Sequence, residues 1–477
     1  MEVYIILIYI LYLTQTTCAI RPNIVFILAD DLGYGDLSCT GSPINLTPNI
    51  DYMANNGIFL TNYYSAAPLC TPSRGSMLTG KYFRKLGLYP GVLDPFSIGG
   101  LNKSHTTYVS ILKNNGYSTT MIGKWHLGIY DGHDPLSHGF DNYFGMPFSH
   151  DECTNDINWT GSTVPYIYGP CPIFDGKKII KQGNMSMMYI DELYLQKSYE
   201  HITTLSKPFY LHIGSHHTHF PQYPENIYAS SVRQLDNFVG SILKKIKETD
   251  NNTIIIFTSD NGAPYWYHDV SGNNLPFRCS KGSTWEGSMR VPAIMFGVNI
   301  KKYRSNIFMT GLDWYSTLLS AAQISNDNYY DGYNMWNVLT DNQNGNNFSL
   351  RKSYFFHSVK TFDNISSPGS VMAARHNNLK YHKYTSGGIC RYDDFDGKCL
   401  YDVPLSYEKK IFDLESDPSE RVDLTERSGI IDFFNALITE HIETFEDAPS
   451  EMLKGMNKTG FPCANMGCSG YPQCCKT

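Results

Sequence analysis

The chain has 477 residues, of which 42% are hydrophobic, 14% aromatic and 17% charged, and its formal net charge is −7. This length exceeds one typical domain and predicts a large core with a smaller appended domain. The composition is that of a globular protein, and the acidic balance disfavours nucleic-acid binding because it offers no basic surface to phosphates.

The N-terminus reads as a secretory signal peptide over residues 1–19. Residues 3–13 are nearly all apolar and are followed by small residues as far as Ala19, although only Glu2 stands where basic residues are usual. The run is too short to span a bilayer, and no later segment looks transmembrane. We therefore expect a soluble mature protein in the secretory pathway, lysosomal or secreted. Eight Asn-x-Ser/Thr sequons agree with that compartment: Asn45, Asn102, Asn158, Asn184, Asn251, Asn347, Asn364 and Asn457.

Five apolar runs predict the strands of a buried, mostly parallel sheet. The first stops just before Asp30, which is the pattern of a strand buried on both faces whose carboxyl end opens into a site. Helical stretches separate the runs, and the apolar residues of 228–248 recur with a 3.6-residue period that suits a helix lying on a sheet. An α/β fold is therefore predicted. The expected strands are residues 24–28, 119–122, 209–214, 253–258 and 292–296, and the expected helices are about 106–115, 228–248 and 312–322.

Cys70 stands between two turn-forming prolines, Pro68 and Pro72, with Arg74 four residues later. At a helix N-terminus this cysteine would face an electropositive site that attracts anions. A buried or disulfide-bonded cysteine beside a proline turn is the ordinary alternative in a secreted protein.

Polar motifs follow the next two expected strands. Lys124 and His126 offer a cation and an acid/base group two residues apart, hence on one side of an extended segment. His216, His217 and His219 follow residues 209–214, and they can either ligate a metal or protonate a leaving group. Taken alone, these three histidines favour metal binding.

Two acidic pairs follow strands and predict an oxygen-only metal site. Asp30-Asp31 follows the first strand and Asp260-Asn261 follows the fourth, so both pairs can meet at the carboxyl edge of a parallel sheet. Such donors prefer Ca²⁺ or Mg²⁺ over zinc. Either pair alone would more simply be an N-cap or an Asx turn, but both at matching strand ends favour the metal. Lys281 follows in a Ser-Lys-Gly-Ser motif and would by itself be a solvated surface charge.

The chain changes character near residue 350. Beyond a stretch rich in Asn and Asp, short β-like runs at 352–357, 370–374, 379–384 and 410–414 precede a helix at about 429–446. We expect a catalytic domain over residues 20–350 and a C-terminal subdomain over residues 351–477. Twelve cysteines occur; Cys18 leaves with the signal peptide and Cys70 is set apart, so ten remain for pairing. Four of these, Cys463, Cys468, Cys474 and Cys475, form a tail like a small disulfide knot, with a zinc knuckle as the disfavoured alternative.

Set in order, these motifs resemble the type I, formylglycine-dependent sulfatases over nearly the whole chain. Cys70-Thr71-Pro72-Ser73-Arg74 fits the signature Cys-x-Pro-Ser-Arg. Within the family the chain is most similar to arylsulfatase A, through residues 147–151, 215–222, 379–382 and the Cys474-Cys475 ending, and next to the galactosamine-sulfate sulfatases, through residues 258–263.

The resemblance implies an alkaline-phosphatase-like α/β sandwich, with a large mostly parallel sheet flanked by helices and a smaller C-terminal antiparallel sheet-and-helix domain. It also implies hydrolysis of sulfate esters. A formylglycine-generating enzyme would oxidise Cys70 to Cα-formylglycine, one hydroxyl of its hydrate would attack sulfur, and the second would expel sulfate and regenerate the aldehyde.

The resemblance also implies a role for each site residue. Asp30, Asp31, Asp260, Asn261 and the modified Cys70 would hold Ca²⁺, with Mg²⁺ as the alternative ion. Arg74 would anchor the modified side chain, His126 would contact the diol, and His219 or Lys281 would protonate the departing alcohol. The substrate would be a sulfated glycolipid or carbohydrate, and homo-oligomerisation is left open. The residues expected to bind the substrate are Lys124, Ser149, His219, Lys281 and His382.

Two other functions compete with this reading. A metal-dependent phosphatase or phosphodiesterase of the same superfold would keep Cys70 as a thiol, but it would add a histidine directly after Asp260-Asn261, where this chain has glycine. A non-catalytic binding protein derived from the family is disfavoured because every motif position that can be matched is intact.

Overall fold

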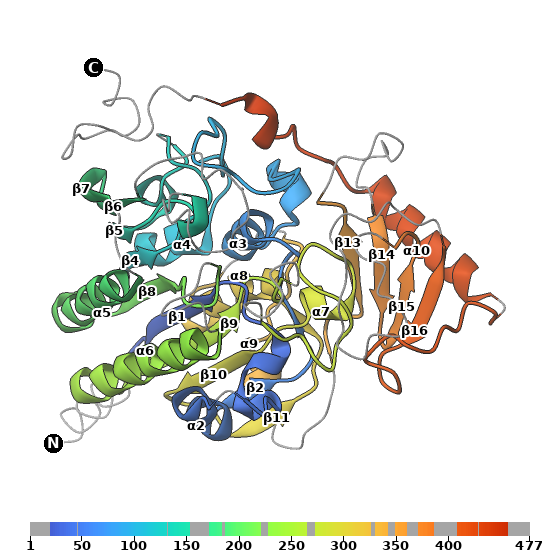
Figure 1. Cartoon of the computed structure of the whole chain (residues 1–477), viewed down its shortest axis with the longest axis horizontal. Helices are drawn as coiled ribbons and strands as arrows, with labels where there is room; N and C mark the ends of the chain where they lie inside the picture. The colour runs from blue at the N-terminus through green and yellow to red at the C-terminus, as the bar shows by residue number, and fades with distance from the viewer. Residues whose placement is uncertain are drawn as a thin grey trace, which may run out of the picture.

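The structure is a computed structural model of the whole chain (Figure 1). The described residues are 20–44, 46–130, 132–152, 171–183, 187–220, 228–264, 272–325, 330–341, 349–359, 371–385, 408–427 and 429–456. The predicted signal peptide, six of the eight sequons and the cysteine-rich tail lie outside them, so those predictions stand as made.

A sheet of ten strands forms the centre of the molecule. Its order is β11-β2-β10-β9-β1-β8-β4-β5-β6-β7. The inner strands β9, β1, β8, β4 and β5 run parallel to one another, whereas β10, β6 and β7 pair antiparallel with the strands beside them. The strands are β1 (Asn23–Ala29), β2 (Ile58–Leu60), β4 (Ser118–Gly123), β5 (Asn142–Gly145), β6 (Cys171–Asp175), β7 (Lys178–Gly183), β8 (Phe209–Gly214), β9 (Thr253–Ser259), β10 (Ala293–Gly297) and β11 (Tyr303–Ser305).

Helices cover both faces of this sheet, and β1 shows why. Its side chains are buried on both sides: Ile24, Phe26 and Leu28 enter one hydrophobic cluster, and Val25 and Ile27 enter another. On the second face α5 and α6 lie side by side (Figure 1). The first cluster includes residues of α3 (Cys70–Thr79), α4 (Tyr108–Asn114) and α8 (Trp314–Ala321), and the second includes residues of α2 (Pro48–Asn56), α5 (Met187–Thr204) and α6 (Tyr228–Thr249).

The predicted α/β fold is confirmed, and so are the five predicted strands, which become β1, β4, β8, β9 and β10. The last differs from the expected parallel arrangement, because β10 pairs antiparallel with β9. An apolar run reports burial on both faces but not strand direction, which depends on the path of the connecting chain. Strands β2, β5, β6, β7 and β11 and helices α2 and α5 were not predicted.

A second, four-stranded antiparallel sheet with α10 (Ile430–Glu443) lies beside the large one, at the right of Figure 1. Its Tyr354 and Phe356 enter the same hydrophobic cluster as β1, and the Tyr354 hydroxyl donates to the Ala66 carbonyl at 2.9 Å. The core therefore continues across residue 350, where the domain boundary remains a prediction. The strands are β13 (Ser353–His357), β14 (Val371–His376), β15 (Leu379–His382) and β16 (Lys410–Asp413).

Among the described cysteines, Cys39 and Cys70 carry free thiols and Cys279 is disulfide-bonded. Cys39 was counted among the ten expected to pair, so that expectation is wrong for this residue. It packs partly buried at the short helical segment Ser38–Thr40, where its amide donates to Asp51 at 2.9 Å.

We expect replacement of Lys380 by methionine to lower the free energy of unfolding by about 3–5 kcal/mol. The Lys380 ammonium lies 2.8 Å from Glu286 and 3.1 Å from Glu420, and all three side chains are fully buried. Without the ammonium, two carboxylates would remain buried together. Urea denaturation measures the loss, and Lys409→Met, at an exposed position before β16, is the control. A loss below about 1 kcal/mol would contradict this account, since that is the range of an exposed pair.

Candidate active site

Four parallel strands end at one edge of the large sheet, and the chain leaving each carries polar residues. Backbone pairing continues past the strand ends: Asp260 N donates to Ala29 O, Ser215 N to Leu28 O and Lys124 N to Gly214 O, at 2.9–3.1 Å. The strand ends therefore bring together side chains that lie more than 200 residues apart in sequence. Gly214 permits this approach, because a Cβ on it would lie 2.5 Å from the Lys124 carbonyl.

Asp30, Asp31, Asp260 and Asn261, the residues predicted to form a metal shell, are all buried at this edge. Asp31 N donates to Asp260 Oδ1 at 3.2 Å, and Asn261 Nδ2 donates to Asp31 Oδ1 at 2.7 Å. Asp31 has a φ of +61°, a left-handed conformation that is uncommon outside glycine and frequent at functional sites.

The chemistry of this donor set fits a hard cation. Asn261 Oδ1 is buried without a hydrogen-bond partner, and the other end of the same amide contacts Asp31. A buried carbonyl oxygen without a donor is costly, and a cation would satisfy it.

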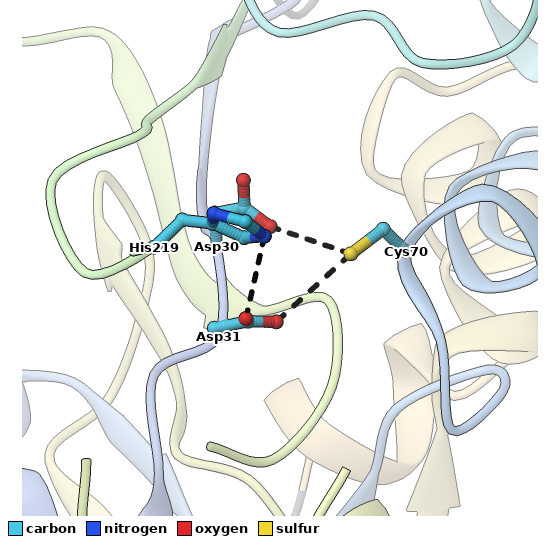
Figure 2. A group of neighbouring side chains, drawn as sticks. All are labelled: Asp30, Asp31, Cys70 and His219. Atoms are coloured by element: carbon cyan, nitrogen blue, oxygen red, sulfur yellow. Dashed lines mark hydrogen bonds and ion pairs between the residues drawn. The ribbon is translucent and has the colours of Figure 1, made fainter. Parts of the chain in front are cut away.

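Cys70 is the first residue of α3, and its thiol points at the carboxylates (Figure 2). Its Sγ lies 3.6 Å from Asp30 Oδ1 and 3.9 Å from Asp31 Oδ1, while His219 Nε2 lies 3.5 Å from Asp31 Oδ2. These four residues offer ligand atoms that all lie within 4.8 Å of one another. Burial raises the pKa of the Cys70 thiol well above its usual value, so the unmodified side chain is a neutral thiol.

Two lysines flank the cluster. Lys281 Nζ lies 2.5 Å from Asp31 Oδ1 and 3.1 Å from Cys70 Sγ. Lys124 Nζ lies 2.6 Å from Asp30 Oδ2 and 2.9 Å from Ser149 Oγ. Both lysines and Ser149 are therefore at the site, where an anion would meet concentrated positive charge.

Arg74 lies one helical turn after Cys70, on the same side of α3. Its guanidinium donates to Asp260 Oδ2 through two nitrogens, at 3.0 and 2.7 Å, and to the Lys124 carbonyl at 3.0 Å. Arg74 also lies 3.4 Å from Asp30, so it ties α3 to the converging strand ends, and its partners are these groups rather than the Cys70 side chain.

The crowded charges shift the acidity of the carboxyl groups in opposite directions. Burial would raise the pKa of Asp30, but Lys124, and after it His219, Arg74 and Lys281, hold it well below its usual range. Burial and the neighbouring Asp30 raise the pKa of Asp260 to about 6. Carboxylates this close compete for the available positive charge, and this favours a site that also takes a cation.

A backbone carbonyl holds the His126 ring beside the cluster. Its Nε2 lies 2.8 Å from the Leu93 carbonyl, and its Nδ1 is buried without a hydrogen-bond partner. Burial, and then Lys124 and Arg74, hold the pKa of His126 well below its usual value, so the imidazole is neutral. Its φ is +60°, a second left-handed residue beside the site.

Two acidic residues that the sequence did not single out flank the site histidines. Glu152 accepts from Ser149 N at 2.9 Å and lies 3.9 Å from His126 Nε2; burial, with Asp151 beside it, raises the pKa of Glu152 well above its usual value. Asp151 lies 3.7 Å from His219 Nδ1. Both follow Ser149-His150 directly, but only the fold brings that segment to the histidines.

His382 is not brought into this cluster. It is fully buried on β15, where Nε2 lies 2.7 Å from Glu420 Oε1 and Nδ1 lies 3.2 Å from Thr284 Oγ1. Thr284 is only three residues from Lys281, so His382 supports the segment that carries Lys281. Its expected contact with substrate remains a prediction.

Comparisons with known proteins agree with this geometry. A sequence model of the family described as Sulfatase matches residues 22–324. Arylsulfatase A from Bos taurus is 31% identical over 95% of both chains, and arylsulfatase G from Homo sapiens is 30% identical over 96% of this chain and 93% of its own. N-acetylgalactosamine-6-sulfatase from Homo sapiens is 34% identical over 67% of this chain and 66% of its own. Among solved structures, the PsFucS1 sulfatase from Pseudoalteromonas sp. matches with a TM-score of 0.73 and 25% identity, over 91% of this chain and 93% of its own.

Proposed function

The chain belongs to the sulfatase family and is a sulfuric ester hydrolase, and on that premise we propose that it uses a formylglycine made from Cys70 and a bound divalent cation. The observation that carries the proposal is the buried Cys70 thiol at the start of α3, between Asp30, Asp31 and Lys281. A formylglycine-generating enzyme would be the partner that modifies it during maturation.

Asp30, Asp31, Asp260 and Asn261 would hold the cation, which we propose to be Ca²⁺, with Mg²⁺ as the alternative. When bound, it supplies positive charge that neutralises the sulfate and the attacking oxygen. Arg74 keeps Asp260 in place through its paired hydrogen bonds and ties α3 to the chain after β4.

Formylglycine supplies a hydrated aldehyde, which carries two hydroxyl groups on one carbon, one to attack sulfur and one to expel sulfate. His126 is the proposed base for the second of these groups, because its buried imidazole is neutral and Nδ1 is free to accept a proton. Glu152, which burial keeps protonated, lies beside the Nε2 face of the ring without adding a negative charge to it.

Lys124, Lys281, His219 and Ser149 are the proposed sulfate ligands. They approach from four separate segments and are at most 7% exposed, so little water screens their charges. Preorganised donors of this kind are commonly the largest contribution to catalysis on an anionic ester. His219 or Lys281 would then give a proton to the departing alcohol.

For the substrate we propose a sulfated glycolipid or carbohydrate. This rests on the similarity to arylsulfatase A and to N-acetylgalactosamine-6-sulfatase, whose name states a sulfated sugar. Lysosomal or secreted location belongs to the same proposal. Among the described residues, none of the helices combines the length and the hydropathy needed to cross a membrane.

Sulfate release from a panel of esters tests the function. The panel should contain sulfatide, 6-sulfated N-acetylgalactosamine, nitrocatechol sulfate and the phosphate ester of the same phenol. We expect release from at least one natural sulfate ester and from the aryl sulfate. Faster hydrolysis of the phosphate ester would overturn the proposal in favour of a phosphatase.

We expect His219→Ala to lose more rate on a sugar sulfate than on nitrocatechol sulfate, by a further factor of roughly 10². Protonation matters most for a poor leaving group, and a sugar alcohol is a far poorer one than nitrocatechol. The ratio of kcat/KM values for the two substrates measures this effect. His219→Gln is the matched control: it can still donate a hydrogen bond to sulfate but cannot act as the acid, so it should show the same discrimination. Equal losses on both substrates would leave His219 as a sulfate ligand and move the acid role to Lys281.

A further inference from the structure

A second group of side chains that can ligate a metal lies between the segment after β8, which also carries His219, and α5. His216 and His217 follow β8, and Asp191 comes from the first turns of α5. Both histidines are buried, and the Asp191 side chain is 16% exposed. None of the three is needed in the sulfate chemistry described above.

The three ligand atoms converge on one point. His216 Nε2 and His217 Nε2 lie 3.0 and 3.2 Å from the same oxygen, Asp191 Oδ1. Tetrahedral zinc with bonds of 2.0–2.2 Å places neighbouring donor atoms about 3.3 Å apart, close to these separations. The two imidazole rings are stacked at 5.1 Å with an interplanar angle of 14°.

Ion pairs with Asp191 hold the two histidines, and well-aligned hydrogen bonds contribute little to this arrangement. His216 is 2% exposed, yet neither Nδ1 nor Nε2 has a hydrogen-bond partner, and Asp191 Oδ1 has none. The contact between His216 and Asp191 is short but misaligned for a hydrogen bond. Apart from these ion pairs the buried atoms lack partners, and a cation between the three ligand atoms would satisfy them together.

The surroundings of His217 favour the imidazole tautomer that can bind a metal through Nε2. Its Nδ1 lies 2.8 Å from Ser215 Oγ, which can accept the Nδ1 proton and leave the Nε2 lone pair for a metal. Ser215 is itself held by its backbone bond to Leu28 of β1. Aromatic side chains, Tyr194 beside His216 and Phe238 beside His217, exclude water from the outer faces of the rings.

We propose that Asp191, His216 and His217 bind a second metal ion, a divalent transition metal of the Zn²⁺ type, separate from the cation of the sulfate site. Two imidazoles and one carboxylate suit Zn²⁺ better than Ca²⁺ or Mg²⁺, which take oxygen ligands. A water molecule would complete the shell.

The role of this ion is to position the turn that carries His219. His219 N donates to the His216 carbonyl at 3.1 Å. In addition, the His150 ring packs edge-on against the rings of both His216 and His219, at 5.5 and 5.3 Å. Fixing two of the five residues 215–219 would therefore limit the movement of the third histidine.

Zinc binding by the full-length protein in excess Ca²⁺ tests the proposal, because Ca²⁺ keeps zinc from the oxygen-only shell. We expect one Zn²⁺ per wild-type chain, and Asp191→Asn should weaken binding at least about 100-fold. Glu192→Gln is the matched control, since it removes the same charge at the exposed next position of α5 and should bind as wild type does. Failure of the wild-type protein to bind zinc, or equal binding by Asp191→Asn, would overturn the site.

X-ray absorption at the zinc edge of the wild-type protein gives a second measurement that does not depend on a variant. We expect two imidazole ligands and no sulfur. A sulfur ligand or a single imidazole would place the ion at Cys70 and His219 instead, and the second site would be wrong. Neither result depends on sulfate release, so this test stands apart from that of the proposed function.

Discussion

Cys70→Ala is expected to lower kcat on every sulfate ester by at least about 10⁴-fold, the scale of losing a nucleophile. The side chain is buried, 3.1 Å from Lys281 and 3.6 Å from Asp30, so alanine removes the reacting group while the helix and its neighbours stay in place. Steady-state kinetics on nitrocatechol sulfate measure the loss. Cys39→Ser is the control, because Cys39 is the other free thiol among the described residues and lies outside the site.

Serine at this position should fail in a different way from alanine. A serine hydroxyl can take up one sulfo group, but no second hydroxyl on the same carbon can expel it, so Cys70→Ser should stop after at most one turnover. Mass spectrometry should then find a single added sulfo group on the peptide that contains residue 70.

In the active wild-type protein, the same mass analysis should show formylglycine at position 70. If an active preparation carried Cys70 wholly as a thiol that iodoacetamide alkylates, the formylglycine mechanism would be excluded and the phosphatase alternative would gain support.

Asp31→Ala is expected to lower kcat/KM by about 10³-fold or more and to remove the bound Ca²⁺ or Mg²⁺. Asp31 is the carboxylate that contacts Asn261, Lys281 and His219 together, so its loss opens the proposed shell and removes the ion-pair partner of Lys281. Metal analysis of the purified protein and kinetics on an aryl sulfate measure the two effects.

Two further variants separate the effect of losing the Asp31 charge from the effect of straining its backbone. Asp31→Asn tolerates the φ of +61° better than alanine does, and it should lose activity while unfolding as wild type does. Asp250→Asn removes one carboxylate before β9, at the opposite end of that strand, and should remain active. Near-normal activity of Asp31→Ala would show that the shell is wrongly assigned. Loss of bound zinc in Asp31→Ala would also show that the shell is wrongly assigned. Zinc that is lost only in Asp191→Asn belongs to the second site.

Much of the fold could be predicted from the sequence, because a buried strand or helix leaves a pattern of apolar residues in its own segment. Residues 24–28 and 254–257 are apolar without interruption, and an acidic residue follows each run within three positions, so both the strands and the polar edge could be predicted. The helix over 228–248 was predicted for the same reason, and Val232, Leu235 and Val239 are all buried in α6. Short strands such as β2 and β11, with three residues each, carry too little pattern to be recognised.

The sequence by itself determined the family, the acidic pairs at two strand ends and Cys70 with its signature, because residue type and spacing within a short segment carry this information. Only the tertiary structure decided which side chains from distant segments come into contact. Arg74 contacts Asp260 across 186 residues, Glu152 reaches His126 and Asp191 meets two histidines of another segment. Each of these contacts depends on sheet register and on the path of loops. The residues of a short segment determine neither the sheet register nor the path of the loops, because both follow from the packing of the whole chain.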